Sequence, residues 1–462
     1  MATDEPTARD PAAAAPSDSP GFLARIVGAV GDRDAPLLRR LLKGLDPADL
    51  ADVFEHLPGE SLRHALRLVG AELPTEWLAN LDWERREQVL ALLPSDYVSR
   101  ALNELDTDDA AAVAADLESE RLDEVLAASP DDVRLAVQEA LSFDEETAGR
   151  LMQREYVAAP EGASVGHVID RLRADSAELP DDFFEVYVVD PRMRPIGVVS
   201  VSKLLRHARD TPLAQIMRAP QALIRPEMDQ EEVAHTFRKY HLASAPVVDD
   251  AGKLTGMVTV DDIVDVIQEE GGEDLLRLSG VSDASQTDTV ARSVKARAPW
   301  ILVNLGTALV ASGVISTFAD SINELVALAV LMPIVASMGG NAGTQALAVA
   351  VRAISNRELT ASNAARYIGR EALTGLSNGV LFAGLLACVA WLWFQSAGLA
   401  LAIALAVLIN FTCAGLAGIL VPLSLRRAGA DPAVSSSVFV TFVTDVMGFL
   451  SFLGLATLIL LR

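Results

Sequence analysis

The 462-residue chain has few cysteines, histidines and aromatic residues, and it is short of positive charge. Its two cysteines, Cys388 and Cys413, both fall in apolar runs, so we expect neither a disulfide framework nor a zinc cluster. The six histidines are scattered between residues 56 and 241 without metal-ligand spacing, and no phosphate-binding loop or nucleophile motif occurs. These absences predict that the protein is not an enzyme.

Negative charge dominates the chain as a whole. Asp and Glu number 63 against 38 Lys and Arg, a net charge of −25, although 51% of the residues are hydrophobic. The two properties separate near Ala298: residues 298–462 hold seven basic and six acidic residues, which leaves −26 for residues 1–297. Because an acidic surface repels phosphate, we expect no nucleic-acid partner and favour metal cations. Residues 1–20 lack the apolar core of a signal peptide, and we expect a disordered leader there.

Long uncharged runs fill the second half. At about 20 residues per span, they predict five transmembrane helices, at about residues 299–318, 325–351, 371–394, 399–425 and 433–461. Lys and Arg precede the first span and lie between the second and third and between the fourth and fifth, whereas the other two loops contain none. The positive-inside rule therefore places these basic loops and the acidic first half in the cytoplasm.

Two polar features interrupt the predicted spans. Asp445 lies about ten residues into the fifth span, where an unpaired charge costs roughly 2.5–3.5 kcal/mol on insertion scales. No Lys or Arg lies within a span to pair with it, so we expect a cation from solution; the alternative is a protonated Asp in a helix-packing hydrogen bond. The second span contains Gly-Gly-Asn-Ala-Gly-Thr-Gln at residues 339–345. These glycines are expected to loosen the helix beside a water-filled cavity, or else to mediate a helix contact unrelated to transport.

Residues 21–152 are expected to form an all-α domain of short stacked helices. Helix starts recur at Asp46-Pro47, Asp106-Thr107 and Ser129-Pro130, each followed by acidic residues near the positive helix end. Leu and Val recur three and four residues apart, which is typical of buried helix faces. The pattern predicts a small superhelix.

Residues 153–274 change to short β-branched runs, and the same unit occurs twice. Each unit has a strand, an Asp-containing turn, a strand with Gly, and then a Ser or Thr before a helix. The strands are expected at 186–189 and 196–199 in the first unit and at 245–248 and 254–258 in the second. The tandem predicts two small α+β domains.

This tandem resembles a pair of CBS domains, at residues 153–210 and 211–274. Such pairs commonly bind adenine nucleotides through a Ser or Thr and an Asp three residues later. The second copy matches through Thr259 and Asp262, whereas the first has Lys203 where the Asp is expected. The resemblance leaves two alternatives open, an ATP site at these residues and a purely structural role in dimerisation.

Seven carboxylates fall within residues 261–274. A charge run is usually a solvated face, but clustered carboxylates repel each other, and a hard dication such as Mg²⁺ would relieve that repulsion through oxygen ligands and retained waters. The run precedes a predicted connector helix, residues 275–297, that leads into the first span. It is therefore a candidate ion sensor at the entrance of a pore.

Taken together, the motifs resemble the MgtE family of magnesium channels and transporters, from about residue 21 to the end. The resemblance rests on the order and spacing of residues 146–152, Glu-Thr-Ala-Gly-Arg-Leu-Met, the acidic stretch 259–274, Arg-Ala-Pro-Trp at 297–300, the glycine-rich run 339–345, and Asp431 with Asp445 fourteen residues on.

The resemblance implies a multi-pass homodimer in the lipid bilayer of the cell membrane, with a pore on the two-fold axis that admits Mg²⁺ and closes when cytosolic Mg²⁺ binds the acidic clusters. Asp445 would hold a hydrated Mg²⁺, and Asp431 would lie at the cytoplasmic mouth. The implied sensor ligands are Asp262, Asp265, Glu270, Glu273 and Asp274. The pore would be lined by Gly339, Gly340, Asn341, Gly343, Thr344, Gln345 and Thr441.

Two other functions remain alternatives. One is a less selective carrier of divalent cations such as Co²⁺ or Mn²⁺, which the lack of His, Cys and Met in the predicted pore motif disfavours. The other is a membrane-tethered nucleotide or metal sensor that transports nothing, although such a sensor has no need of a carboxylate within the membrane. We therefore expect a Mg²⁺-selective channel or transporter.

Overall fold

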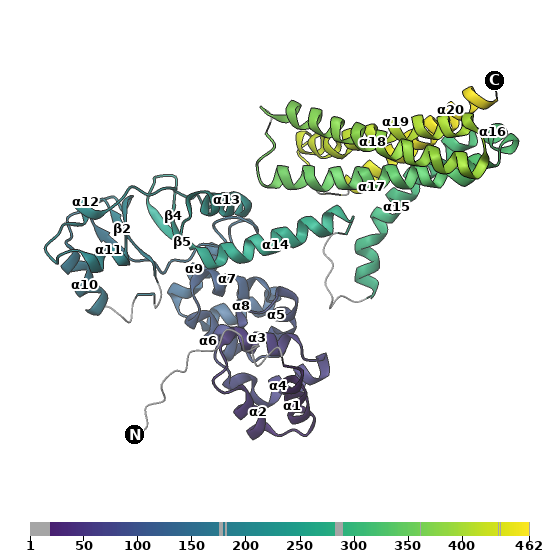
Figure 1. Ribbon diagram of the computed structural model, residues 1–462. Helices are drawn as coiled ribbons and strands as arrows, with labels where there is room; N and C mark the ends of the chain where they lie inside the picture. The colour runs from purple at the N-terminus through teal and green to yellow at the C-terminus, as the bar shows by residue number, and fades with distance from the viewer. Residues whose placement is uncertain are drawn as a thin grey trace. The chain divides into compact units, whose positions relative to one another are not determined.

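The protein is described here by a computed structural model that covers residues 19–174, 179–180, 183–281, 290–360, 362–432, 434 and 436–461 (Figure 1). Of the predicted disordered leader, residues 1–18 lie outside this part, and the first helix begins at Pro20. The chain divides into two compact units, the first ending at Ile267 and the second beginning at Gln268. We call them the soluble unit and the membrane unit.

The first part of the soluble unit is helical, as expected. Its helices are α1 (Pro20–Gly31), α2 (Ala35–Leu42), α3 (Pro47–Glu55), α4 (Gly59–Val69), α5 (Trp83–Leu90), α6 (Ser95–Glu104), α7 (Thr107–Ala115), α8 (Ser119–Ala128) and α9 (Asp131–Ala140), with short 3₁₀ helices Gly70–Glu72 and Glu76–Leu78. Asp46 caps α3 by accepting the Ala48 N–H. The predicted cap Ser129 is displaced by Pro130, because the buried Ser129 hydroxyl bonds the Val125 carbonyl instead.

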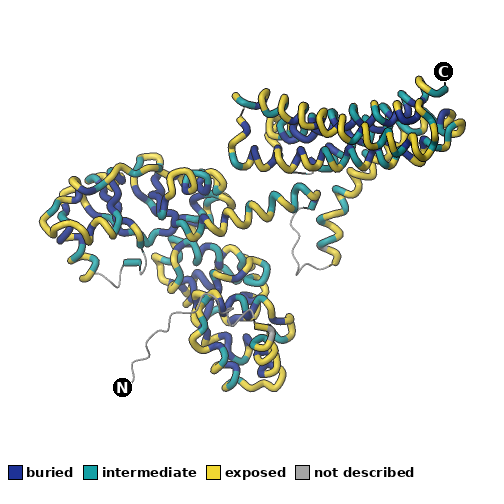
Figure 2. The backbone as a smooth tube through the Cα atoms, in the orientation of Figure 1, coloured by how far each residue is buried: buried dark blue, intermediate teal, exposed yellow. Residues whose placement is uncertain are grey.

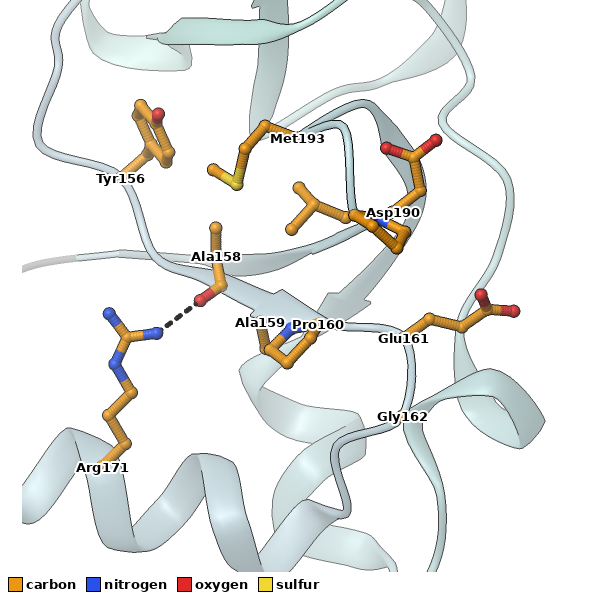
Figure 3. A pocket seen from close by; sticks show the side chains of 11 residues that line it. Tyr156, Ala158, Ala159, Pro160, Glu161, Gly162, Arg171, Asp190 and Met193 are labelled. Atoms are coloured by element: carbon orange, nitrogen blue, oxygen red, sulfur yellow. Dashed lines mark hydrogen bonds between the residues drawn. The ribbon is translucent and has the colours of Figure 1, made fainter.

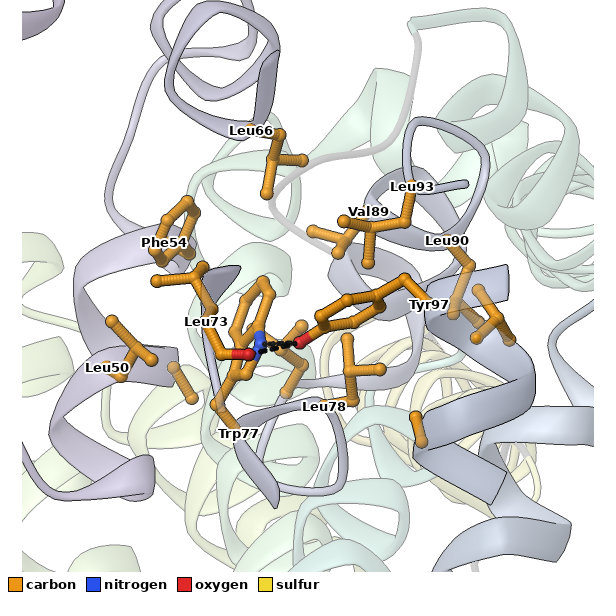
Figure 4. Packing of buried hydrophobic residues seen from close by; sticks show 14 of the residues in the cluster. Leu50, Phe54, Leu66, Leu73, Trp77, Leu78, Val89, Leu90, Leu93 and Tyr97 are labelled. Carbon is orange, nitrogen blue, oxygen red and sulfur yellow. Dashed lines mark hydrogen bonds between the residues drawn. The ribbon is translucent and has the colours of Figure 1, made fainter. Parts of the chain in front are cut away.

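Aromatic residues fix the centre of this helical part (Figure 4). Trp77 is fully buried, and its ring packs on Phe54 with centroids 4.7 Å apart. The Trp77 indole N–H donates to the Tyr97 hydroxyl over 3.0 Å, and that hydroxyl donates to the Pro74 carbonyl over 2.7 Å. Because both polar tips are satisfied, the two large rings bury their apolar area without an orphaned donor.

The second part of the soluble unit is the predicted tandem. One sheet has the order β1 (Ala158–Pro160), β2 (Glu185–Val189), β3 (Pro195–Ser200), and the other pairs β4 (Ser244–Val248) with β5 (Leu254–Thr259). The helices are α10 (Val165–Ala174), α11 (Val201–Arg206), α12 (Leu213–Ile216) and α13 (Gln230–Tyr240). β2–β3 and β4–β5 are antiparallel with a bulge at the same place in each.

The two turns show the repeat most clearly. The Asp190 carboxylate accepts hydrogen bonds from the backbone N–H groups of residues 192 and 194, over 2.8 and 2.9 Å. Asp249 repeats this with residues 251 and 253, over 2.9 and 2.8 Å. Met193 and Gly252 both have positive φ, 61° and 77°. Equal Asx turns in both copies confirm the predicted internal repeat.

The structure differs from the prediction of a separate connector helix at residues 275–297. α14 (Val260–Leu278) passes into its first residues and ends at Leu278, two residues before Gly280, whose φ is 72°. The Val281 N–H there bonds the Leu276 carbonyl, a common glycine-terminated helix end. Residues 282–289 lie outside the described part, and α15 (Val290–Ser316) then runs unbroken into the first span. The described ends of the connector are therefore continuations of two longer helices.

Within the described residues, five helices are long and apolar enough to cross a membrane: Ser293–Ser316 of α15, α17 (Ala327–Ser355), α18 (Ala364–Phe394), α19 (Ala397–Arg427) and α20 (Ser436–Leu460). They correspond to the five predicted spans. α18 starts seven residues before the predicted 371, because Arg366 and Arg370 belong to its first turns. The short α16 (Ala319–Glu324) follows α15.

α19 is the central helix of the membrane unit. Half of its apolar window is buried, against 6% for α15, and Figure 2 shows the corresponding dark and light tubes. Small residues allow close crossings: a Cβ at Gly375 would stand 2.5 Å from the Phe411 carbonyl oxygen, and one at Gly415 would stand 2.7 Å from that of Glu371. Such contacts are how helices associate where lipid removes the hydrophobic driving force.

Candidate cation sites

Asp445 lies on α20 and is half-buried. Among the described residues, no hydrogen bond or ion pair reaches its carboxylate, so the alternative of a helix-packing hydrogen bond finds no partner within this part of the chain. Its neighbour Thr444 is fully buried, with its hydroxyl bonded to the Thr441 carbonyl over 2.9 Å. Asp445 is thus a carboxylate on an apolar helix, and none of the described residues pairs with it as a counter-charge.

The predicted pore run 339–345 lies within α17, which is continuous despite Pro333 and the glycines. Its residues divide between two faces. Gly339 and Gly343 are buried: a Cβ on Gly339 would lie 2.1 Å from Asn410 Nδ2, and one on Gly343 would lie 2.5 Å from Val440. Each glycine thus makes a close contact with α19 or α20 within this chain, and its place at a pore stays a prediction.

The other residues of the run face outward or into a cavity. Asn341 and Gln345 line a cavity of about 690 Å³ between α17, α18 and α19, whose other polar lining residues are Arg370, Glu371, Thr374 and Asn378. Thr344 is exposed, with its hydroxyl bonded to the Asn341 carbonyl over 3.0 Å. Gly340 is half-buried and lies near Thr444. The polar members of the run are therefore those available to solvent or to a partner chain.

The soluble unit brings together carboxylates from α7 and α14, which we call the α7–α14 cluster: Asp108, Asp109 and Asp262. Burial, and then the charge of Asp262, raise the pKa of Asp108 well above its usual range. Burial raises the pKa of Asp109 to about 6, with the charge of Asp106 adding to the shift. Burial likewise raises the pKa of Asp262 to about 7, and Asp261 and Asp109 add to it. The cluster holds more negative charge than its surroundings stabilise.

Hydrogen bonds fix both sides of this cluster. On α14, the Thr259 hydroxyl donates to Asp262 over 2.6 Å. At the start of α7, Glu155 accepts from the Thr107 hydroxyl over 2.7 Å and from the Thr107 N–H over 3.2 Å. The charge of Arg86 acts on Asp109, but the Arg86 guanidinium pairs with Asp116 at 2.6 Å. The carboxylates are therefore held in place without a dedicated counter-ion among the described residues.

Asp265 lies one turn beyond Asp262 on α14, and burial followed by the charge of Asp261 raises its pKa. The predicted ligand Glu270 lies further along the same helix. The structure thus assigns the sensor residues inferred from the resemblance to different parts of one helix, with Asp262 and Asp265 in the soluble unit and Glu270, Glu273 and Asp274 in the membrane unit.

A second acidic group, which we call the Arg277 cluster, contains Glu273, Asp274, Arg277 and Asp431. The Arg277 guanidinium pairs with Asp431 at 2.6 Å and with Glu273 one turn before it. The Ser355 hydroxyl at the end of α17 donates to Asp274 over 3.0 Å. Burial, and then the charge of Asp431, raise the pKa of Asp274. The Arg277 side chain thus supplies positive charge beside carboxylates that the resemblance assigns as Mg²⁺ ligands.

The donor set of both clusters suits Mg²⁺, which takes hard oxygen ligands and keeps several of its waters. Within the described ranges, no three acidic, His or Cys side chains converge to hold one ion directly. One or two carboxylates acting through water are sufficient for Mg²⁺. Half-buried carboxylates with raised pKa values are also the groups that a dication stabilises most, since it removes both their repulsion and their unpaired charge.

The predicted nucleotide residues have other partners. Thr259 and Asp262 bond each other, and the acidic neighbours of Asp262 disfavour a phosphate. The cleft between the CBS repeats holds only about 10 Å³, because Arg218 pairs with the buried Glu185 at 2.6 Å within it. A larger cavity of about 710 Å³ lies in the first repeat, between Tyr156, Met193 and Arg171, and neither predicted residue lines it (Figure 3).

Four residues of these sites are not identified by sequence analysis. Asp108 and Asp109 are explained there as helix-start residues, and no local pattern brings them to Asp262. Arg277 follows the acidic run by three residues, so its charge is visible but its partner Asp431, 154 residues on, is not. Asn410 is a polar amide within a long apolar helix, and this contrast is the signal in the sequence that could have identified it.

Comparison with known proteins gives matches along most of the chain. Residues 45–146 match the MgtE intracellular N domain, residues 148–210 and 213–269 match the CBS domain, and residues 332–455 match the MgtE divalent cation transporter domain. These matches confirm the expected multi-domain organisation. With the five apolar helices, they identify a multi-pass membrane protein whose N-terminal domains are cytosolic.

Several known proteins are similar over most of their length. The magnesium transporter MgtE of Thermus thermophilus is 32% identical over 94% of this chain and 97% of that protein. The magnesium transporter MgtE of Enterococcus faecalis is 34% identical over 70% of this chain and 71% of that protein. A crystal structure of the cytosolic domain of the Mg²⁺ channel MgtE in complex with ATP is 32% identical, covers 53% of this chain and 99% of that chain, and has a TM-score of 0.48.

Proposed function

We propose that this chain, which belongs to the MgtE family of magnesium transporters, carries Mg²⁺ across the cell membrane as a channel that cytosolic Mg²⁺ closes. The single observation that carries the proposal is Asp445, a half-buried carboxylate on an apolar span with no hydrogen bond or ion pair to the described residues. An intramembrane carboxylate without a protein partner is costly and marks an ion pathway.

Conduction would proceed past α20 and the outward face of α17. Asp445 supplies charge, while Asn341, Thr344 and Gln345 supply neutral oxygens on the neighbouring helix. Because Mg²⁺ loses its waters reluctantly, a carboxylate that attracts the hydrated ion is better suited to passage than a tight cage. The absence of His, Cys and Met from this set supports Mg²⁺ over softer ions. Two copies of the chain would be needed to surround a path, which the homodimer supplies.

Closure would use the two acidic clusters. Cytosolic Mg²⁺, when bound, supplies positive charge that cancels carboxylate repulsion. The α7–α14 cluster would hold it through Asp108, Asp109 and Asp262, and the Arg277 cluster through Glu273, Asp274 and Asp431. Ser437 at the start of α20 donates to the Leu278 carbonyl at the end of α14 over 2.7 Å. This bond joins the sensor helix directly to the helix that carries Asp445, so a shift of one helix biases the other.

The test is Mg²⁺ uptake into proteoliposomes with low internal Mg²⁺, for the wild type and Asp445→Asn. The control is Asp320→Asn, which removes an exposed carboxylate of the same unit from α16. We expect uptake in the wild type and the control and a loss of about a hundredfold or more in Asp445→Asn, the scale of a missing intramembrane charge.

Other outcomes separate the alternatives. Wild-type uptake of Mn²⁺ or Co²⁺ as fast as Mg²⁺ would favour the less selective carrier. No uptake of any of these ions by the wild type at low internal Mg²⁺ would favour the tethered sensor. Equal uptake by all three proteins would leave transport standing and contradict the role assigned to Asp445.

A further inference from the structure

Asn410 is the amide at the centre of the membrane unit. It lies on α19 and is fully buried, and its Nδ2 donates to the Val335 carbonyl of α17 over 3.0 Å. Its Oδ1 has no hydrogen-bond partner among the described residues. An aliphatic side chain of similar size would fill the same space without an unpaired acceptor, so the amide is retained at a cost to stability. A costly polar group in a membrane indicates a functional reason.

Two glycines make room for this amide. A Cβ on Gly339 of α17 would lie 2.1 Å from Asn410 Nδ2, and a Cβ on Gly448 of α20 would lie 2.8 Å from the same atom. Real Cβ atoms do not approach so closely, so neither position accepts a side chain while Asn410 stays in place. A single amide is therefore enclosed by three helices, and it explains why the glycine-rich run begins with Gly339.

The same two helices carry the proposed ion-binding side chains. Asn341 follows Gly339 by two residues on α17, and Asp445 precedes Gly448 by one turn on α20. We propose that Asn410 is a positioning residue for Mg²⁺ conduction: its amide joins α17 to α19 beside the Gly448 notch of α20 and so sets the height of Asn341 relative to Asp445. This inference rests on the proposed transport function.

The physical reason is the geometry that Mg²⁺ requires. The hydrated ion is octahedral and tolerates little change in the spacing of the oxygens that accept from its waters. A hydrogen bond from Asn410 to a backbone carbonyl restricts sliding of α17 along α19, whereas apolar contacts alone restrict it weakly. Loss of the amide should therefore weaken ion binding more than it weakens the fold.

The test separates the hydrogen bond from the packing. Mg²⁺ uptake into proteoliposomes is measured against external Mg²⁺ for the wild type, Asn410→Ala, and Asn410→Ala combined with Gly339→Ala, whose added methyl refills the vacated space. Melting temperatures are measured in detergent for each. The control is Thr412→Val on the same helix, because the Thr412 hydroxyl already bonds its own helix at Leu408 over 2.8 Å.

We expect Asn410→Ala to raise the half-saturating Mg²⁺ concentration about five- to tenfold, the factor that one net hydrogen bond supplies, and to lower the melting temperature. The double variant should regain the melting temperature of the wild type but keep the raised half-saturation. Thr412→Val should match the wild type in both.

Two results would overturn the inference while leaving the proposed function intact: a double variant that recovers half-saturation as well as melting temperature, or an Asn410→Ala that behaves like Thr412→Val. If Asn410→Ala does not fold, the double variant alone decides between these outcomes. Absence of uptake in the wild type would instead overturn the proposed function, and the inference with it.

Discussion

The α7–α14 cluster and the Arg277 cluster both gather carboxylates, but the repulsion between these negative charges is reduced in different ways. In the first, Asp108, Asp109 and Asp262 have no committed cation, and burial raises the pKa of all three, to about 6 for Asp109 and about 7 for Asp262. In the second, Arg277 pairs with Glu273 and Asp431. Bound protons therefore offset part of the charge in the first cluster, whereas a side-chain cation offsets it in the second. A dication would have to displace protons from the first and a guanidinium from the second.

Changing the pH should give the largest difference between the two clusters. The pKa of Asp262 rises from 3.8 to about 7, so its contribution to stability is present below pH 4 and is lost as pH rises through 7. This amounts to something on the order of 4 kcal/mol at 1.4 kcal/mol per unit. In chelator, and relative to the intrinsic exchange rate at each pH, we expect hydrogen exchange of α7 and of the first turn of α14 to accelerate from pH 4 to pH 8.

Added Mg²⁺ should reverse this acceleration. The end of α14 beside Arg277 serves as the internal control and should change less, since a guanidinium stays charged over this range. Equal acceleration in both places would remove the distinction between the clusters.

Removing two carboxylates from the α7–α14 cluster should abolish its response to Mg²⁺. At a Mg²⁺ concentration of a hundred times Kd, binding stabilises the wild type by about 2.7 kcal/mol, whereas Asp108→Asn combined with Asp262→Asn should show no such gain. Proteolysis of the full-length protein at increasing Mg²⁺ measures this, and uptake by the same double variant should no longer be closed by internal Mg²⁺.

The matched control removes two exposed carboxylates of α8, by Asp123→Asn with Glu124→Gln. It should keep the full Mg²⁺ response. A control that loses the response would mean that overall charge, rather than the cluster, is sensed.

Replacing Arg277 tests the other cluster. Arg277→Met removes the guanidinium that pairs with Glu273 and Asp431, so Mg²⁺ should bind there more readily. We expect the internal Mg²⁺ concentration that halves uptake to fall about five- to tenfold, within the range of ordinary coupling energies. Arg277→Lys should stay near the wild type, and Arg366→Gln removes a similar charge from an exposed site on α18. A higher Mg²⁺ requirement in Arg277→Met would show that Arg277 supports closure instead of competing with it.

The smallest expected effect lies in the core of the helical domain. Tyr97→Phe removes the acceptor of the Trp77 N–H and the donor to the Pro74 carbonyl. We expect a loss of about 1–2 kcal/mol in the unfolding free energy with no change in the Mg²⁺ response. Denaturant unfolding and the proteolysis assay measure the two quantities. A changed Mg²⁺ response would mean that sensing depends on general stability, which would weaken both of the preceding tests.

Local patterns predict most elements of this protein. Uncharged runs identify the five spans, and the repeated Asp turns identify the tandem, because these signals depend on neighbours in sequence. The connector helix is placed less well, since Gly280 ends α14 by backbone conformation rather than by composition. Among the candidate sites, Asp445 is visible because a charge in an apolar span stands out. Gly339 is assigned to the pore from its motif, although its contact with Asn410 is made across 71 residues.

The amino-acid sequence by itself determined the acidic first half, the five apolar spans, the internal repeat and the lone intramembrane carboxylate, since each follows from the order of polar and apolar residues. Only the tertiary structure decided which charges meet. Asp108 faces Asp262, Arg277 pairs with Asp431, and Asn410 lies between Gly339 and Gly448. Electrostatic and steric energies depend on distances through space, and those distances are set by the packing of whole helices and domains.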